Sequence, residues 1–202
     1  MLVARLIESS EANGPGKRAV VWFQGCNLRC PQCCNPELQP MESESAFEMT
    51  PRDLAVWFKG VLNSDPSIRG LTLSGGEPML PSRVDELAMF LNIARSISVV
   101  PFDVMVFTGV ENIRHHIGAD MYIAGPYDDS LCNTTGIVSS TNQKILRFSG
   151  AFDDITDEEL INGQRIVEVM VIGDSVVITG LSSIDHTMEI VGLKTDGGVQ
   201  SS

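Results

Sequence analysis

The sequence predicts an α/β protein with a parallel sheet, followed by a β-hairpin extension toward the C-terminus. Short apolar runs alternate along the chain with segments whose apolar residues recur at helical spacing. Gly or Pro residues follow most of the apolar runs, which is typical of buried strands that lead into loops. After about residue 163 the pattern changes. Two β-type runs, 165–172 and 175–178, flank Gly173-Asp174, which is a hairpin signature.

Five apolar runs are expected to form the strands of the main sheet. The first covers residues 18–23 and ends at a Gln-Gly pair, and the second covers residues 68–73. The remaining three cover residues 103–108, 121–124 and 143–148. Strands that alternate with helices usually pair in parallel, with the helices as crossover connections.

Capping residues mark where the helices begin. Thr50 is a favoured N-cap and Pro51 suits the first helical position, so a helix is expected there with an apolar stripe on one face. Ser82 is expected to cap a second helix, and a short third helix is expected over residues 111–117. Residues 156–159, Thr-Asp-Glu-Glu, form a capping box that begins a short fourth helix.

A chain of 202 residues is long enough for one domain with a small appendage. We expect the main domain to cover residues 1–163 and an accessory β-hairpin to cover residues 164–190. Residues 191–202 are rich in Gly and Ser, so a disordered tail is expected there.

The charge balance restricts the partners that this chain can bind. Fourteen basic residues against 26 acidic residues give a net charge of −12. Binding to nucleic acid or to anionic membranes depends on Lys and Arg, so neither is expected here. No apolar run approaches the roughly 20 residues of a membrane span, and the first residues are too short and charged for a signal peptide. A cytoplasmic protein is therefore expected.

Four of the five cysteines lie between Cys26 and Cys34, and three of them have the spacing C-x3-C-x2-C. In a reducing compartment such crowding indicates metal ligation or redox chemistry and not structural disulfides. Cys26, Cys30 and Cys33 could converge on an iron–sulfur cluster, and three ligands would leave one iron open for chemistry. A structural zinc site with Cys34 or Cys132 as the fourth ligand is the alternative, although no second C-x2-C unit is present.

A glycine-rich turn, Ser74-Gly-Gly-Glu-Pro78, lies where the second strand leads into a helix. Glycines let the backbone approach a ligand closely and adopt positive φ angles. Taken alone, this segment fits an ordinary strand-to-helix turn equally well.

Together the two motifs resemble radical S-adenosylmethionine (SAM) enzymes, a family whose fold is a partial (β/α) barrel. The resemblance implies that Cys26, Cys30 and Cys33 hold a [4Fe–4S] cluster whose fourth iron binds SAM. It implies that Gly75, Gly76 and Glu77 contact the methionyl amino group of SAM. In this family the reduced cluster cleaves SAM, and the resulting 5′-deoxyadenosyl radical abstracts a hydrogen atom from the substrate.

Five further segments are similar to the activating enzymes of glycyl radical enzymes, above all the small activase of anaerobic ribonucleotide reductase. The segments are residues 13–18, 33–36, 107–109, 124–127 and 140–143. This resemblance covers roughly residues 1–150. It implies a glycyl radical enzyme as the protein substrate and an electron donor such as flavodoxin or ferredoxin.

Two alternatives to an activase stay open. Relatives of this kind also include radical SAM enzymes that modify a peptide or a small molecule directly. A non-catalytic metal-binding module is the second alternative, since the cysteines alone do not demand catalysis.

Two further polar residues lie at an end of an expected strand and are candidate cofactor contacts: Thr108 ends the third strand, and Asn142 comes just before the fifth. Thr108 ends the third strand, at the face where barrel enzymes bind ligands, and could bond the ribose or carboxylate of the cofactor. A Thr at a strand end that caps the backbone is equally consistent with the pattern. Asn142 either contacts the cofactor or caps a loop.

Overall fold

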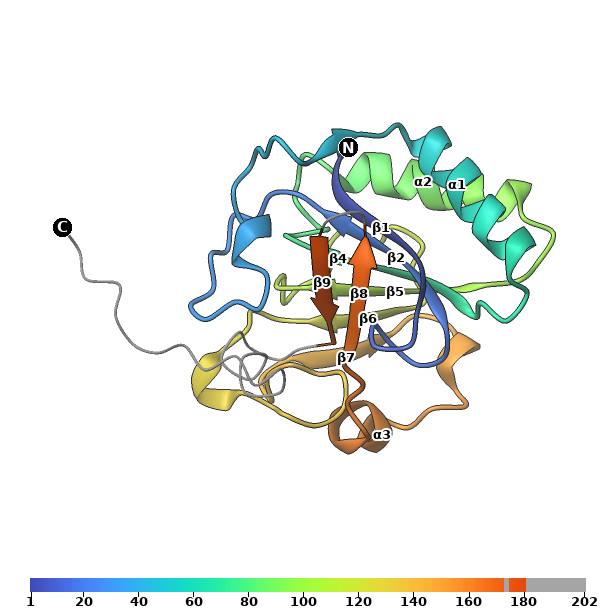
Figure 1. Cartoon of the computed structure of the whole chain (residues 1–202). Coiled ribbons are helices and arrows are strands. Elements are labelled where there is room, and N and C mark those ends of the chain that lie inside the picture. The colour runs from blue at the N-terminus through green and yellow to red at the C-terminus, as the bar shows by residue number, and fades with distance from the viewer. Residues whose placement is uncertain (173–174, 181–202) are drawn as a thin grey trace.

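The computed structural model describes residues 1–172 and 175–180, and within them a seven-stranded sheet is the central feature (Figure 1). The strand order is β3-β1-β2-β4-β5-β6-β7. The strands are β1 (Leu2–Ser10), β2 (Arg18–Phe23), β3 (Phe47–Glu48), β4 (Gly70–Gly75), β5 (Asp103–Thr108), β6 (Met121–Ala124) and β7 (Lys144–Arg147). The sheet does not close into a barrel, because β3 and β7 lie at opposite ends of the strand order.

The centre of the sheet is parallel and its two edges are antiparallel. Strands β2, β4, β5 and β6 pair in parallel, so their carboxyl ends meet at one edge of the sheet. This confirms the expected α/β class. The expectation of a parallel fifth strand was wrong, since β7 pairs antiparallel with β6. Parallel neighbours are usually joined by a crossover helix, and residues 125–143 between β6 and β7 contain only a short 3-10 helix, Asp129–Leu131.

Strand β1 was not among the expected elements. It pairs antiparallel with β2 along most of its length and is joined to it by residues 11–17. Along β1 only Val3, Ile7 and Ser10 are buried, so its sequence lacks the continuous apolar run that reveals β2, in which every residue is buried.

Helices α1 (Pro51–Ser64) and α2 (Val84–Ile97) pack side by side on one face of the sheet (Figure 1). The N-cap prediction for α1 is confirmed, since the Thr50 hydroxyl accepts a hydrogen bond from the backbone N–H of Asp53. The prediction that Ser82 caps α2 is wrong. Ser82 is exposed, and the residue at the N-cap is Arg83, which makes no side-chain cap.

The short helix expected over residues 111–117 is absent, and this segment has an irregular path. A helix of about two turns is unstable without tertiary support. Here Ile117 is buried against the core, and its N–H donates to the hydroxyl of Tyr122. A tertiary contact therefore satisfies this N–H without a helix. Helix α3 (Asp157–Asn162) does form, with the expected capping box of Thr156 and Glu159.

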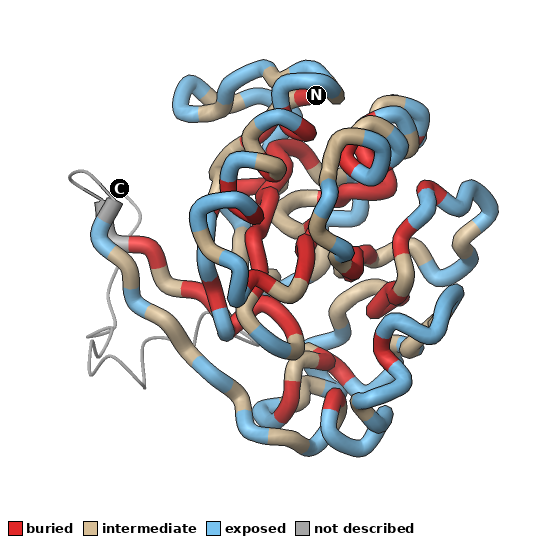
Figure 2. Tube along the Cα trace, turned by 90° about the vertical axis from the view of Figure 1, so that its right-hand side faces the viewer, coloured by how far each residue is buried: buried red, intermediate tan, exposed pale blue. Residues whose placement is uncertain are grey.

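The predicted hairpin forms from β8 (Glu168–Ile172) and β9 (Ser175–Thr179), and it covers the sheet face away from α1 and α2 (Figure 1). Side chains along β2 alternate between the two faces. Val21 and Phe23 pack with the helices, whereas Val20 and Trp22 pack with Val177 of the hairpin. Buried segments are accordingly concentrated in the central strands, and exposed ones in the connections (Figure 2). The tail predicted for residues 191–202 lies outside the described residues.

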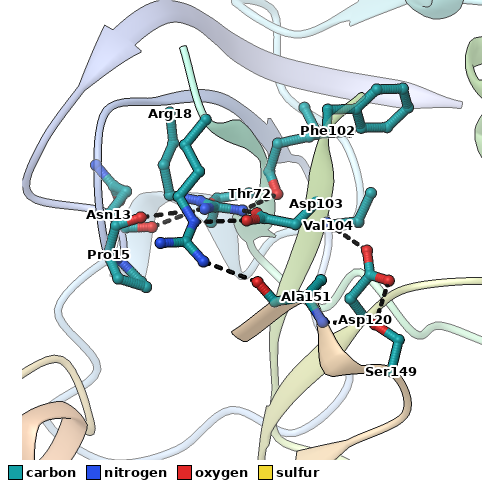
Figure 3. Close-up of polar contacts among 12 residues, drawn as sticks. Asn13, Pro15, Arg18, Thr72, Phe102, Asp103, Val104, Asp120, Ser149 and Ala151 are labelled. Atoms are coloured by element: carbon teal, nitrogen blue, oxygen red, sulfur yellow. Dashed lines mark hydrogen bonds and ion pairs between the residues drawn. The ribbon is translucent and has the colours of Figure 1, made fainter. Parts of the chain in front are cut away.

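A buried ion-pair network closes the amino-terminal ends of the parallel strands (Figure 3). Arg18, which begins β2, is fully buried and bonds Asp103 of β5 at 2.5 Å. The same carboxylate accepts from Arg69 at 2.6 Å, and Arg69 also pairs with Asp154. Arg18 further donates to the Thr72 hydroxyl at 2.8 Å. The network therefore fixes the register of β2, β4 and β5 at the end opposite to the cysteine loop.

Candidate functional site

The cysteine loop leaves β2 at the carboxyl edge of the parallel strands. Two backbone bonds close its base, from Gly25 N to Leu38 O at 2.9 Å and from Cys26 N to Gln39 O at 3.0 Å. All five cysteines of the chain have free thiols. The loop is therefore a closed excursion that presents Cys26, Cys30 and Cys33 without using them as crosslinks.

Two residues of this loop have left-handed backbone conformations. Arg29 has φ 51° and Gln32 has φ 55°, a region that non-glycine residues seldom occupy. Each stands immediately before a cysteine of the motif. Strain of this kind persists where the surrounding structure imposes it, and it gathers at ligand sites. The loop backbone is therefore shaped to direct its cysteines.

The glycine turn after β4 is packed directly against the base of this loop. Gly76 N donates to Phe23 O at 2.8 Å, and Glu77 N donates to Gly25 O at 2.9 Å. Gly75 has φ +104°, which favours glycine. A Cβ atom on Gly76 would lie 2.3 Å from the Gly25 carbonyl oxygen. The glycines are thus required for the close approach of the turn and the loop.

Glu77 is almost fully buried, and its carboxylate is held by groups of the protein itself. It accepts hydrogen bonds from Met79 N at 2.7 Å, Thr108 Oγ1 at 2.5 Å and Gly109 N at 2.8 Å. Burial raises the pKa of Glu77, and these hydrogen bonds oppose the shift. The side chain therefore ties the glycine turn to the end of β5. Thr108 takes part in this arrangement as a donor to Glu77.

Arg83 joins the same two segments from the helix side, a role that the sequence analysis missed. Its guanidinium donates to Gln24 O and to Glu77 O, each at 2.5 Å, and lies 4.7 Å from the ring centroid of Phe23. Arg83 is 6% exposed. Arg83 was overlooked because the sequence analysis placed the N-cap of α2 one residue earlier, at Ser82, which is a favoured capping residue.

A cavity of about 160 Å³ joins the cysteine loop to the carboxyl ends of β4, β5 and β6. Of the candidate residues, the lining includes Cys26, Cys30, Cys33, Gly75, Gly76, Glu77 and Thr108. Asn142 does not line it. The Asn142 side chain is exposed and donates to Pro126 O at 2.8 Å, so in this structure it caps a loop. The fold therefore brings two sequence motifs, about 50 positions apart, to one cavity.

Thiols are the donors that an iron–sulfur cluster takes from a protein. Within the described residues, no three Cys, His or acidic side chains are gathered as ligands of one ion. Each thiolate that binds a four-iron cluster bonds a different iron, so such ligands stand apart around a shared space. Cys26, Cys30 and Cys33 do border one space. A hydrogen bond from Cys34 lowers the pKa of Cys33 to about 6, which favours the thiolate that binds metal.

The C-terminal hairpin supplies part of the cavity wall. Ile178, Thr179 and Gly180 line the cavity together with Asn13 from the β1–β2 connection. The Asn13 amide donates to the Thr179 hydroxyl at 2.8 Å, and Glu168 accepts from the backbone N–H of Glu11 at 2.9 Å. The hairpin is thus bonded to the β1–β2 connection and forms one wall of the cavity. Periodicity predicted its existence but not this location.

Comparison with known proteins assigns the class of this site. The family described as "4Fe-4S single cluster domain" matches residues 12–146, which include the cysteine loop, the glycine turn and all four parallel strands. The chain therefore belongs to this iron–sulfur family.

Relatives with assigned names confirm the resemblance to activating enzymes. A Haemophilus influenzae protein, named for the activation of a glycyl-radical enzyme, is 41% identical over 76 residues, 38% of this chain and 28% of that protein. The pyruvate formate-lyase-activating enzyme of Streptococcus mutans is 36% identical over 100 residues, 46% of this chain and 36% of the enzyme. The anaerobic ribonucleoside-triphosphate reductase-activating protein of phage T4 is 26% identical over 147 residues, 70% of this chain and 90% of that protein.

The match thus spans about a third of the first two relatives and most of the phage protein. The family match establishes an iron–sulfur protein, and the chain is similar to activating enzymes over part of its length. No helix in the described part of the chain is long and apolar enough to cross a bilayer.

Proposed function

We propose that this protein is a radical SAM enzyme that activates a glycyl radical enzyme. The observation that carries the proposal is the single cavity on which the three motif cysteines and the Gly75–Glu77 turn converge. Names of relatives from three sources support the same activity. We further infer a partial barrel of the radical SAM type as its fold and the cytoplasm as its location.

In this proposal Cys26, Cys30 and Cys33 hold the [4Fe–4S] cluster. When bound, the cluster and SAM would supply a nucleoside radical that removes a hydrogen atom from the substrate, and the one electron needed to cleave SAM would come from an external reductant. In this proposal the backbone of Gly75 and Gly76 orients the methionyl group of SAM, with the Gly76 N–H bonded to Phe23 O and Gly75 held at φ +104°. Thr108 lies on the same wall.

The carboxylate of Glu77 is engaged by groups of the protein itself. Its carboxylate already accepts three hydrogen bonds from the protein and is 1% exposed. We infer that it acts as a positioning residue, which keeps the backbone of the turn facing the cavity. A contact of Asn142 with the cofactor is not part of this proposal, because Asn142 lies outside the cavity lining.

The protein partner is proposed to be a glycyl radical enzyme, with flavodoxin or ferredoxin as the electron source. Direct modification of a peptide or small molecule is the second candidate, favoured by the hairpin, whose Ile178 and Thr179 narrow the cavity from one side. A test for the partner is electron paramagnetic resonance of a candidate glycyl radical enzyme after incubation with this protein, SAM and reductant. A glycyl signal supports an activase, whereas product formed from a small substrate without that partner contradicts it.

The cofactor assignment is tested on protein reconstituted without oxygen. Wild type is expected to bind about four irons and to release 5′-deoxyadenosine from SAM on reduction, as three-cysteine clusters with an open iron allow. Cys30→Ala is expected to lose both properties. Cys132→Ala is the matched control, because Cys132 does not line the cavity, and it should keep its iron. Iron loss in both variants, or in neither, would contradict the ligand assignment.

A further inference from the structure

The cysteine loop has a neck, where residues 24–26 are hydrogen-bonded to residues 37–40, and the buried side chain of Gln24 crosses it. Gln24 is the first residue after β2 and is 2% exposed. Its Nε2 donates to the backbone carbonyls of Glu37 at 3.2 Å and of Pro40 at 2.7 Å. These acceptors lie 13 and 16 residues further along the chain. One side chain therefore joins the outgoing end of the loop to its returning end.

The backbone of Gln24 is itself held by neighbouring elements. Its N–H donates to Leu2 O of β1 at 3.1 Å, and its carbonyl accepts from the guanidinium of Arg83 at 2.5 Å. The same guanidinium donates to Glu77 O in the glycine turn. Gln24 does not line the site cavity. It is therefore a fixed point behind the site, and it would act on a bound group only through the loop.

The returning segment, residues 37–40, is held by an unbroken run of hydrogen bonds. The backbone N–H groups of Gly25 and Cys26 donate to its two middle carbonyls at 2.9 and 3.0 Å. The two acceptors of the Gln24 amide lie immediately on either side of these, so four consecutive carbonyls are bonded to residues 24–26. A side-chain amide carries two donor hydrogens, which suits this pair of carbonyl acceptors. Gln24 therefore completes a closure that the two backbone bonds make only in part.

The path of the rest of the loop depends on this neck. Residues 26–35 form neither helix nor strand, so no regular ladder of backbone hydrogen bonds directs them. All three motif cysteines lie in this stretch. The conformational freedom of a loop falls when its two ends are held together. Without the Gln24 donors two carbonyls at the neck would lose their partner, and the returning segment would be held less firmly.

We propose that Gln24 is a positioning residue that clamps the cysteine loop, so that the three motif thiols are held around one cavity before a cluster binds. The inference rests on the proposed function, because it takes Cys26, Cys30 and Cys33 as the cluster ligands. Ligands that are held in advance lose less conformational entropy on binding, and differences in affinity of this kind appear mostly in the rate of release. Loss of the clamp should therefore shorten the time for which the protein keeps its iron.

The test uses the full chain loaded with its cluster in the absence of oxygen. Release of iron to the chelator bathophenanthroline disulfonate is followed in wild type and in Gln24→Met. The substitution keeps the length of the side chain and removes both donor hydrogens. The variant is expected to release its iron about tenfold or more faster than wild type, as expected for the loss of two hydrogen bonds.

Hydrogen exchange of the same samples separates a local role from a general one. In Gln24→Met the backbone N–H groups of Gly25 and Cys26 should exchange about tenfold or more faster, because their acceptors lie in the segment that Gln24 holds, whereas those of β4 and β5 should keep their protection. Asn133→Leu is the matched control. Its amide likewise joins a loop to a distant carbonyl, that of Ile161 at 2.8 Å, but it lies outside the cavity lining and should release iron as wild type does.

Release of iron from Gln24→Met at the wild-type rate would overturn the inference, and so would equally fast release from Asn133→Leu. If Gln24→Met loads no iron, hydrogen exchange decides: faster exchange confined to the neck supports the clamp, and faster exchange across β4 and β5 contradicts it, since Gln24 would then support the fold as a whole. Failure of the proposed function is recognised separately. In that case wild type itself would release no 5′-deoxyadenosine from SAM on reduction, whatever the exchange rates at the neck.

Discussion

The buried pair of Arg18 and Asp103 allows the sharpest prediction about stability. Asp103→Asn keeps the shape of the side chain and removes its charge. Arg18 is fully buried and Asp103 is 6% exposed, so the substitution leaves a buried guanidinium facing a neutral amide. Breaking one partner of such a pair costs about 3–5 kcal/mol, a large part of the roughly 5–15 kcal/mol that stabilises a domain.

The matched control is Asp154→Asn. Asp154 accepts two bonds from Arg69, the second arginine of the same network, but its side chain is 61% exposed. An exposed pair contributes about 0.2–1 kcal/mol. The chemical change and the network are the same in the two variants, which differ in burial and in the number of paired arginines, two for Asp103 and one for Asp154.

The assay is urea unfolding of the oxygen-free protein, with equal m-values required for a comparison of the two variants. With an m-value of about 2 kcal/mol/M, Asp103→Asn should lower the midpoint by roughly 1.5–2.5 M and Asp154→Asn by less than about 0.5 M. Iron per folded molecule should not change, since the network lies at the strand ends away from the cysteine loop. Equal shifts in the two variants would refute the argument from burial.

Three further predictions concern the site and its cover. Gly76→Ala should lower iron and SAM binding, measured as iron content, because its Cβ would lie 2.3 Å from the Gly25 carbonyl oxygen. The control Gly60→Ala, on the open surface of α1, should keep its iron and raise the stability by about 0.5–1 kcal/mol in thermal unfolding. Val177→Ala should lower the free energy of unfolding by about 1–3 kcal/mol, and Val171→Ala, at a side chain that is 76% exposed, by less than about 0.5 kcal/mol. Equal losses in the two variants would mean that the hairpin does not cover β2 in solution. Burial raises the pKa of Glu77, so the stability of wild type should fall relative to Glu77→Gln as pH rises from the unfolded-state pKa of about 4.3 through the raised folded-state pKa. Urea unfolding across this pH range measures the difference, and the opposite slope would mean that the three hydrogen bonds outweigh burial.

The extent of the sequence-based prediction follows from how local each signal is. The spacing of Cys26, Cys30 and Cys33 and the glycine turn can be read directly, because ligand spacing and backbone freedom belong to short segments. The strands 18–23 and 103–108 were found because continuous apolar runs mark buried parallel strands. Strand β1 was missed because only three of its nine residues are buried, so it carries no such run.

Errors arose where long-range contacts override local preference. Ser82 has better capping chemistry than Arg83, yet α2 begins after Arg83, whose side chain is drawn inward by the carbonyls of Gln24 and Glu77. The antiparallel direction of β7 was likewise invisible, since strand direction depends on the path of the connection and not on the composition of the strand.

The sequence by itself determined the chemistry that the chain can offer: three thiols on one loop, a glycine turn and an α/β alternation. Only the tertiary structure decided how these parts meet. It placed the hairpin over the cysteine cavity, tied Glu77 to Thr108, and set the side chain of Gln24 across the neck of the cysteine loop. The physical reason is that burial and hydrogen-bond satisfaction are properties of residues far apart in the chain, and they acquire values only when the chain has folded.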